Sequence, residues 1–200
     1  MGDEARILIV CTGNICRSPF IERLLQCRLD ERQRTRGRQG PAGTTLVHSA
    51  GTGGLAGWAM DERAAAQLVA HGGDPAGFRA RELTPDLIAV SDLVLTATRA
   101  HRGKVAAMSP KALRRLFTFR DFADLVAGID GQGTGVTGTD QRAWVRQLAE
   151  EASARRGVNP PLDPAQADIV DPFRRQDRVF AEMAQQVVES MPAVVRALAG

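Results

Sequence analysis

The chain is poor in cysteine and has no long apolar run, and both absences limit what it can be. Its three cysteines, Cys11, Cys16 and Cys27, are odd in number and lie close together in the N-terminal region. They provide no disulfide framework, so we expect the protein in the reducing cytoplasm. The N-terminal apolar run, Ile7–Val10, is too short for a signal peptide or a membrane span. We therefore expect neither, and no membrane partner.

The chain also has few lysines and a small net charge. Only Lys104 and Lys111 accompany the arginines, and 26 basic against 23 acidic residues leave a formal charge of +3. So small a surplus of positive charge does not indicate a nucleic-acid-binding surface. The locally basic stretch Arg28–Arg38 is more typical of a solvated helix end than of a binding surface for an acidic partner. The 200 residues, 44% of them hydrophobic, instead predict one domain with a substantial core.

The most informative segment is Cys11–Ser18, with the sequence CTGNICRS. The branched apolar residues Ile7–Val10 before it predict a buried strand, and the residues from Pro19 onward predict a helix. The backbone amides of such a turn converge on an anion, and the helix dipole adds positive potential. We expect a thiolate at Cys11 and, in Arg17, a planar fork that matches two phosphate oxygens. The loop therefore predicts phosphoryl transfer through a phosphocysteine.

A purely structural interpretation competes with this one. A cysteine at a strand end is commonly a small buried hydrophobe. The spacing from cysteine to arginine also arises by chance in many proteins. Against this interpretation stand Gly13 and Asn14, which suit unusual backbone angles, and Ser18-Pro19, which suits the start of a helix. The combination favours the phosphate cradle.

Four segments predict buried parallel strands: residues 6–10, 45–49, 92–96 and 114–118. Predicted helices alternate with them, and a long last helix covers about 175–199. This alternation predicts an α/β fold with a parallel sheet. In open sheets of this kind the ligand lies beyond the carboxyl ends of the strands, which is where Cys11, Ala50-Gly51 and Thr96 fall.

Two stretches before the C-terminal helix depart from a compact pattern. Residues 128–138 contain five glycines, which is a flexible composition. Residues 140–156 predict an amphipathic helix that carries Trp144. We interpret residues 124–162 as an insertion within a single domain of residues 1–200. This insertion is either a lid that influences which substrate is accepted or a tolerated surface excursion.

A second catalytic group must come from elsewhere in the chain, because a thiolate that attacks phosphorus needs an acid to protonate the departing oxygen. Asp171 fits this role. It follows the apolar pair Ile169-Val170 and precedes the rigid Pro172 and the aromatic Phe173. Taken alone, Asp-Pro is only a turn signal. Its combination with the N-terminal loop favours a general acid.

Together these motifs resemble the low-molecular-weight protein tyrosine phosphatases. The signature loop of that family, Cys-x5-Arg-Ser-Pro, matches Cys11–Pro19, and its late Asp-Pro-aromatic matches Asp171–Phe173. Further landmarks lie between the two: Ser49–Thr52, Asp61–Ala64, His71-Gly72 and Ala80–Thr84. The loop that contains Leu55 is similar to the bacterial branch paired with exopolysaccharide tyrosine kinases. The likeness covers roughly residues 5–122 and 168–200.

The resemblance implies a fold and a reaction. The fold would be a three-layer α/β/α arrangement around a central four-stranded parallel sheet. The reaction would be the hydrolysis of phosphotyrosine on a protein, a bacterial tyrosine kinase among the candidates, without metal or cofactor. Cys11 would be the nucleophile, Arg17 would bind phosphate and stabilise the transition state, and Asp171 would act first as general acid and then as base.

Supporting roles follow from the same resemblance. Ser18 would hydrogen-bond the thiolate and assist it as a leaving group. Asn14 would hold the loop open in a left-handed conformation, with support from Ser49. Substrate or phosphate contacts are implied for Thr12, Gly13, Asn14, Ile15, Cys16, Ser18, Leu55 and Phe173.

The chain departs from the family pattern at several positions. Family members usually carry tyrosine after the Asp-Pro, whereas this chain has no tyrosine and continues with Phe173 and two arginines. We therefore expect altered stacking of the substrate. Phe78 stands where a histidine is usual, which predicts weaker support of Asn14. Leu55 replaces the bulky aromatic residue of eukaryotic members.

Three other interpretations stay open. An arsenate reductase on this fold that is coupled to thioredoxin needs cysteines downstream, and none follows Cys27. A version that uses a small external thiol remains an alternative. Arginine-phosphate phosphatases carry threonine where Ile15 stands, and Ile15 favours an aromatic ester. A non-catalytic phosphate-binding module is expected to have lost Cys11, Arg17 or Asp171, and all three are present. 

Cys16 has two interpretations of its own. It either packs beneath the loop or forms a disulfide with Cys11 after mild oxidation, which would protect Cys11 from irreversible oxidation.

Overall fold

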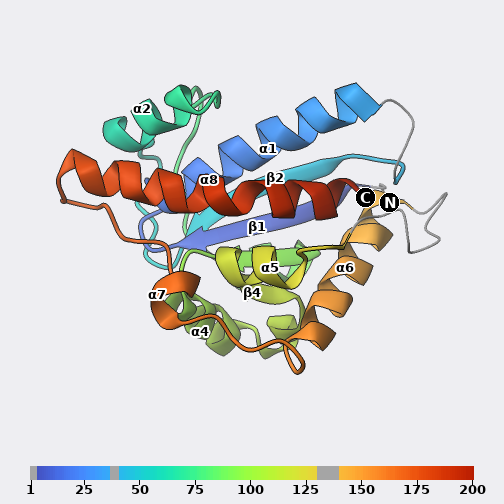
Figure 1. Ribbon diagram of the computed structural model, residues 1–200. Coiled ribbons are helices and arrows are strands. Elements are labelled where there is room, and N and C mark those ends of the chain that lie inside the picture. The colour runs from blue at the N-terminus through green and yellow to red at the C-terminus, as the bar shows by residue number, and fades with distance from the viewer. Residues whose placement is uncertain (1–3, 37–40, 130–139) are drawn as a thin grey trace.

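The computed structural model describes residues 4–36, 41–129 and 140–200. Its centre is a sheet of four parallel strands in the order β2-β1-β3-β4 (Figure 1). The strands are β1 (Ala5–Cys11), β2 (Thr45–Gly51), β3 (Leu93–Thr96) and β4 (Leu116–Thr118). The predicted α/β fold with a four-stranded parallel sheet is confirmed.

The carboxyl ends of these strands share one edge of the sheet, because all four run in the same direction. Cys11 pairs with Gly51, and Val10 pairs with Thr96. Thr96 in turn pairs with Thr118. The positions that the sequence placed at strand ends therefore lie side by side, and the loops that follow them can form one site.

Helices cover both faces of the sheet and link its strands. They are α1 (Arg17–Arg36), α2 (Glu62–Ala70), α3 (Pro85–Val90), α4 (Arg99–Met108), the 3₁₀ helix η1 (Pro110–Arg115), α5 (Phe119–Leu125), α6 (Gln141–Arg155), α7 (Pro164–Ala167) and α8 (Asp177–Ala199).

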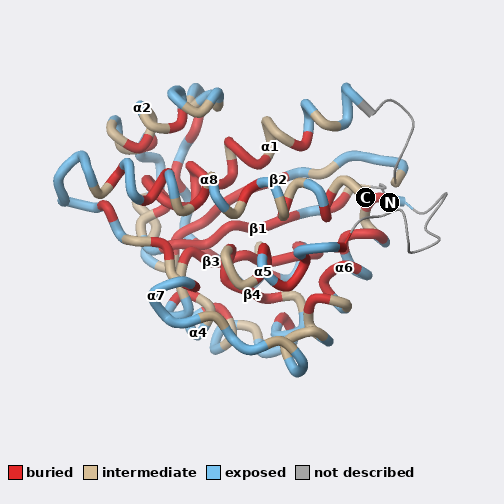
Figure 2. Tube along the Cα trace, in the orientation of Figure 1, coloured by how far each residue is buried: buried red, intermediate tan, exposed pale blue. Residues whose placement is uncertain are grey.

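Strand β1 shows why the arrangement has three layers. Ile7 and Ile9 point into the larger core, which is shared with α1, α5 and α8. Leu8 and Val10 point into the opposite core, which is shared with α3 and α4. Successive side chains of a strand face opposite sides, so a strand buried on both sides is apolar at every position. Figure 2 shows the sheet buried between its two helical layers.

The sequence patterns missed four helices of the described chain and placed the start of β4 two residues too early. Residues 114 and 115 belong to η1, which Pro110 begins, so β4 is shorter than predicted. No pattern singled out η1, α4, α5 or α7. α5 and α7 are at most seven residues long, and α4 contains Gly103. Helices this short depend on tertiary packing and on caps such as Thr98, whose side chain accepts from the His101 amide.

Helix α6 belongs to the core and lies at the edge of the sheet opposite Cys11. Trp144 is 1% exposed, and its indole N–H donates to the carbonyl of Ala197 in α8 at 2.9 Å. Arg142 and Arg146 contact Asp92, just before β3, at 3.0 and 2.7 Å. Figure 1 shows α6 beside the two chain ends, away from the carboxyl ends of the strands. The helix is therefore not a lid over the site. The glycine-rich residues 130–138 lie outside the described residues, and the assignment of 124–162 as an insertion stays a prediction.

We expect the exchange Trp144→Ala to lower the free energy of unfolding by about 3–5 kcal/mol, because it opens a cavity in the core and removes the donor to Ala197. Urea unfolding followed by circular dichroism measures the loss. The matched control is Trp58→Ala, since Trp58 is 62% exposed. Its effect should stay within about 0.5 kcal/mol. Similar losses in both variants would contradict a core role for α6.

Candidate active site

The segment Cys11–Ser18 joins β1 to α1, as the sequence predicted. Cys11 is the last residue of β1, and Arg17 is the first residue of α1. Both are buried, with 2% and 5% of their surface exposed. The tip of a strand and the N-terminus of a helix thus bring a thiol and a guanidinium together where the helix dipole favours negative charge.

Neighbouring backbone fixes the orientation of this loop. The carbonyl oxygens of residues 11, 12 and 13 accept hydrogen bonds from the amides of residues 52, 53 and 55 at 2.9, 3.1 and 3.0 Å. The end of β2 approaches so closely that a Cβ on Gly51 would lie 2.3 Å from the Thr12 carbonyl oxygen. Only glycine fits there. Because these carbonyls are engaged by neighbours, the loop can offer its amides to an anion.

Ser18 contacts the Cys11 thiol directly. The distance from Cys11 Sγ to Ser18 Oγ is 2.9 Å, and both atoms are buried. Asn14 Nδ2 donates to the same oxygen at 2.9 Å. Since that oxygen already accepts, its own hydrogen is available to the sulfur.

Asn14 holds the loop from three sides. Its φ of 56° lies in the left-handed region, which asparagine tolerates better than most residues. Besides Ser18, its Nδ2 contacts Ser49 Oγ at 2.7 Å, and its Oδ1 accepts from the Arg81 amide at 2.8 Å. The predicted contact with Ser49 is present. Asn14 is thus well supported although Phe78 replaces the usual histidine, contrary to the expectation of weak support.

Glu22 extends this support and was missed from the sequence. Ser49 Oγ donates to Glu22 Oε2 at 2.5 Å. Burial raises the pKa of Glu22, and the hydrogen bond from Ser49 offsets part of that rise. No motif singled out Glu22, because a glutamate on the buried side of α1 acquires a role only when β2 packs against that helix.

Asp171 reaches the loop from the distant C-terminal part of the chain. Its Oδ2 lies 2.9 Å from Arg17 Nη2, and its side chain is 55% exposed. The amide of Ile169 donates to the carbonyl of Ala97, just after β3, and this contact directs the segment to the carboxyl edge of the sheet. Asp171 Oδ1 accepts from the amide of Phe173 at 3.2 Å. The structure thus brings all three predicted catalytic groups to one edge.

His101 is a further neighbour of the loop that no motif revealed. Its Nε2 lies 2.8 Å from Thr12 Oγ1, and its Nδ1 lies 2.7 Å from Thr98 Oγ1. Burial and the nearby Arg17 guanidinium lower the pKa of His101 to about 4. The imidazole is therefore neutral at pH 7 and fixes the Thr12 side chain by hydrogen bonding.

Stability should fall in mild acid because two buried histidines resist protonation. The pKa of His101 and that of His48 on β2 both lie at about 4, the latter lowered chiefly by burial. The unfolded chain takes up these protons near pH 6.5, so stability present above that pH is lost as the pH falls towards 4. We expect each histidine to contribute a loss on the order of 2 kcal/mol between pH 7.5 and 5.

Urea unfolding at the two pH values measures this effect. The variant His48→Gln, with an uncharged side chain on β2 away from the Cys11 loop, should lose less stability between them than the wild type. An unchanged pH dependence would contradict the assignment.

The other residues with predicted substrate or phosphate contacts are buried to different extents. Ile15 and Cys16 are 6% and 4% exposed and belong to the larger core, so their side chains support the loop from beneath. Burial, followed by the charge of Asp61, raises the pKa of Cys16 to about 12, which keeps it a thiol. Leu55 packs beside Gly13. Phe173 is 43% exposed on the segment that carries Asp171.

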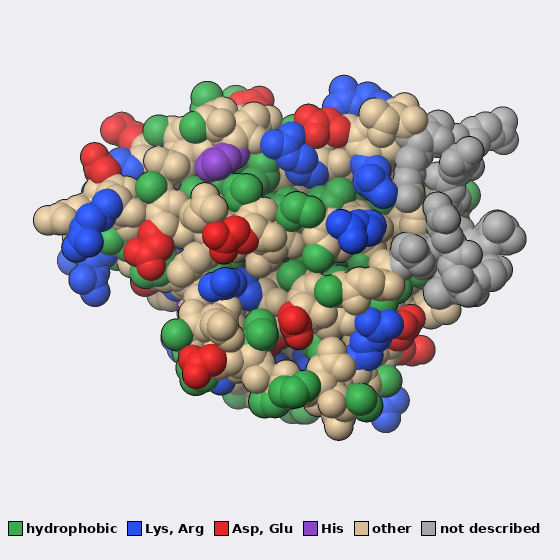
Figure 3. Space-filling model, in the orientation of Figure 1, with side chains coloured by type: hydrophobic (Ala, Val, Ile, Leu, Met, Phe, Trp, Pro, Cys, Tyr) green, Lys and Arg blue, Asp and Glu red, His purple; other side chains and the backbone are tan. Residues whose placement is uncertain are grey.

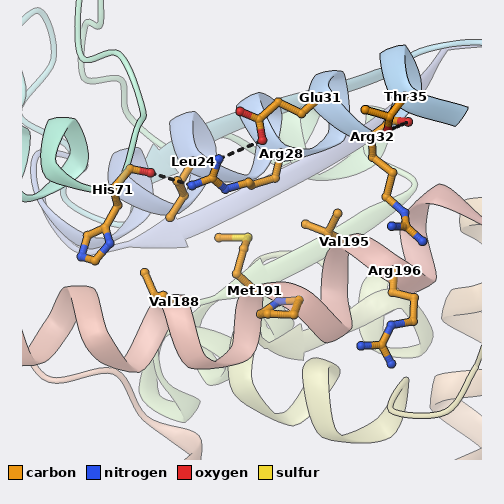
Figure 4. A pocket seen from close by; sticks show the side chains of 11 residues that line it. Leu24, Arg28, Glu31, Arg32, Thr35, His71, Val188, Met191, Val195 and Arg196 are labelled. Atoms are coloured by element: carbon orange, nitrogen blue, oxygen red, sulfur yellow. Dashed lines mark hydrogen bonds and ion pairs between the residues drawn. The ribbon is translucent and has the colours of Figure 1, made fainter.

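A separate groove lies between α1 and α8 (Figure 4). It encloses about 460 Å³, and its lining combines Leu24, Val188 and Met191 with arginines such as Arg28. None of the predicted site residues lines it. The groove therefore lies outside the candidate active site.

The described residues contain neither a metal-binding cluster nor a helix suited to a membrane. Within residues 4–36, 41–129 and 140–200, no three His, Cys, Asp or Glu side chains are grouped so that they could hold a metal ion. No helix in those ranges combines the length and the apolarity that a membrane crossing requires.

Comparison with known sequences decides the family. The profile of the family "Low molecular weight phosphotyrosine protein phosphatase" matches residues 6–132, more than half of the chain. The chain belongs to this family. It is 35% identical over 111 residues to the probable low molecular weight protein-tyrosine-phosphatase EpsP of Ralstonia solanacearum, covering 56% of this chain and 68% of EpsP. It is also 36% identical over 113 residues to the phosphatase Etp of Escherichia coli K12, with shares of 56% and 68%. These bacterial relatives agree with the expected bacterial branch.

Solved structures of a tyrosine phosphatase and an arginine phosphatase show the same fold. The tyrosine phosphatase AmsI of Erwinia amylovora superimposes with a TM-score of 0.65 at 24% identity, over 100% of this chain and 95% of that one. The YwlE arginine phosphatase of Geobacillus stearothermophilus gives 0.62 at 25% identity, over 96% and 90%. Since proteins with different phosphorylated substrates share this fold, the substrate must be argued from the site.

Proposed function

We propose that the protein hydrolyses phosphotyrosine on proteins through a phosphocysteine intermediate. The Cys11 thiolate attacks phosphorus, forming the S–P bond while the bond from phosphorus to the phenolic oxygen breaks. Asp171 gives its proton to that oxygen, and the phenol leaves. Arg17 and the loop amides hold the phosphoryl oxygens, whose charge they stabilise in the transition state.

The second half of the reaction regenerates the enzyme. Asp171, now a carboxylate, takes a proton from water as the water oxygen attacks phosphorus. The S–P bond breaks, inorganic phosphate leaves, and the Ser18 hydroxyl stabilises the departing thiolate. Every catalytic group in this cycle is a side chain or a backbone amide of the protein, and the other reactant is water. The proposal therefore requires neither metal nor cofactor.

One observation carries the proposal: Arg17 at the start of α1 and Asp171 from the distant C-terminal segment meet at 2.9 Å. A structural cysteine loop requires no carboxylate above it, whereas phosphoryl transfer to and from cysteine requires an acid there. A phosphate-binding module without catalysis also has no use for that acid.

The aromatic ester is favoured by Phe173, which is 43% exposed on the segment that carries Asp171 and can stack against a phenyl ring. The relatives EpsP and Etp are named protein-tyrosine-phosphatases. We therefore propose a phosphotyrosyl protein as substrate, with a bacterial tyrosine kinase as one such protein. We propose the cytoplasm as its compartment because three free cysteines lie in the described residues.

A parallel assay of three substrates tests the function. The purified protein is given a phosphotyrosyl peptide, a phosphoarginyl peptide, and arsenate with a small thiol. We expect phosphate release from the first at a kcat/KM at least about 100-fold above the second, and no arsenite from the third. Preference for the phosphoarginyl peptide, or reduction of arsenate, would show that phosphotyrosine is not the substrate. Binding of phosphate without any turnover would favour the regulatory module.

A further inference from the structure

Three arginines follow the proposed general acid. Arg174, Arg175 and Arg178 are exposed, and together with Gln176 and Val179 they line a hollow of about 410 Å³ where the chain enters α8. Figure 3 shows Lys and Arg side chains gathered at the left edge of the molecule, where Figure 1 places the start of α8. The positive charge lies a few residues from Asp171.

No carboxylate in the described part of the chain pairs with these three arginines. Asp177, the nearest acidic residue in α8, lies 3.8 Å from Arg63, and Asp171 pairs with Arg17. Arg178 Nε donates to the neutral Gln176 Oε1 at 3.1 Å. Among the described residues the hollow therefore has three guanidiniums without a paired carboxylate, and such a positive surface attracts anions.

The segment is also held in a defined conformation beside the proposed substrate wall. The amide of Arg175 donates to the carbonyl of Pro172 at 2.9 Å, and its own carbonyl accepts from Arg63 Nη1 at 2.6 Å. Arg174 has a φ of 59°, and its guanidinium lies 5.1 Å from the centre of the Phe173 ring. The charge of Arg174 thus lies next to the ring against which a phosphotyrosine would stack.

We propose that Arg174, Arg175 and Arg178 select phosphotyrosyl segments that carry acidic side chains next to the phosphotyrosine. This inference rests on the proposed function and names its substrate class. While the phosphate occupies the Cys11 loop, the flanking carboxylates lie over the exposed hollow and pair with its guanidiniums. Such rim charges chiefly increase the rate of productive encounter, so the effect belongs in kcat/KM and weakens with salt.

Two matched phosphotyrosyl peptides test the proposal, one with Asp and Glu flanking the phosphotyrosine and one with Asn and Gln at the same positions. For the wild type we expect kcat/KM to be about tenfold higher with the acidic peptide, as two exposed ion pairs can supply. In 0.5 M salt the ratio should approach about one. Aryl phosphate serves as a third substrate that has no flanking residues.

The variant Arg175→Gln/Arg178→Gln should lose most of this preference while its kcat/KM for aryl phosphate stays within about twofold of the wild type. The control Lys111→Gln/Arg114→Gln removes the same charge from η1, beside a hollow that includes Asp92 at the opposite edge of the sheet. It should keep the preference.

The outcomes separate this inference from the function on which it rests. Equal kcat/KM for both peptides in the wild type would contradict the proposed selectivity, and so would an equal loss of preference in both double variants. Neither result would affect the proposed phosphatase activity. Absence of hydrolysis with every phosphotyrosyl substrate overturns both.

Discussion

Replacing Cys11 with serine should lower the kcat for aryl phosphate by roughly 10³–10⁶-fold, while inorganic phosphate still binds. The serine hydroxyl is a much weaker nucleophile at neutral pH, and the imidazole of His101 contacts Thr12 rather than residue 11. Arg17 and the loop amides remain, so the anion site survives. Steady-state kinetics and calorimetric titration with phosphate measure the two effects.

The matched control is Cys27→Ser. Cys27 lies on α1, where its thiol approaches the Gly72 carbonyl at 3.5 Å rather than the Cys11 loop. Its activity should stay within about twofold of the wild type. Comparable activity of Cys11→Ser and the wild type would remove the phosphocysteine from the mechanism. Loss of phosphate binding together with turnover would instead mean that the substitution disrupts the loop.

The exchange Asp171→Asn should reveal its role through the leaving group. With phenyl phosphate, whose departing phenoxide needs a proton, we expect kcat to fall by about 10²–10⁴-fold. With a nitrophenyl phosphate, whose leaving group departs unprotonated, the loss should be much smaller. Pre-steady-state kinetics of the first step, compared between the two substrates, measures the difference directly.

Asp177→Asn is the charge-matched control for this experiment, since Asp177 is 89% exposed at the start of α8 and pairs with Arg63. It should leave both substrates nearly unaffected. An equal loss with both leaving groups in Asp171→Asn would show that Asp171 positions Arg17, which it contacts at 2.9 Å, rather than donating a proton.

The amino-acid sequence by itself determined the central sheet and the signature loop. Ile7–Val10 is apolar at every position because β1 lies in the middle of a parallel sheet and is fully buried on both faces. Cys11–Ser18 is contiguous, so the strand before it and the helix after it were sufficient to place nucleophile and guanidinium at one point. Asp171 could be predicted only through its match to a known pattern, because an isolated Asp-Pro indicates no more than a turn.

Only the tertiary structure revealed the distant partners that no motif indicated. Glu22 supports Asn14 through Ser49 because β2 pairs with β1 in a register that places Gly51 opposite Cys11. His101 meets Thr12 only after α4 packs on the sheet. In the same way α6, which the sequence pattern left as either a lid or a surface excursion, packs into the core at the far edge of the sheet. Local patterns report which face of an element is apolar, whereas strand register and helix packing decide what that face meets.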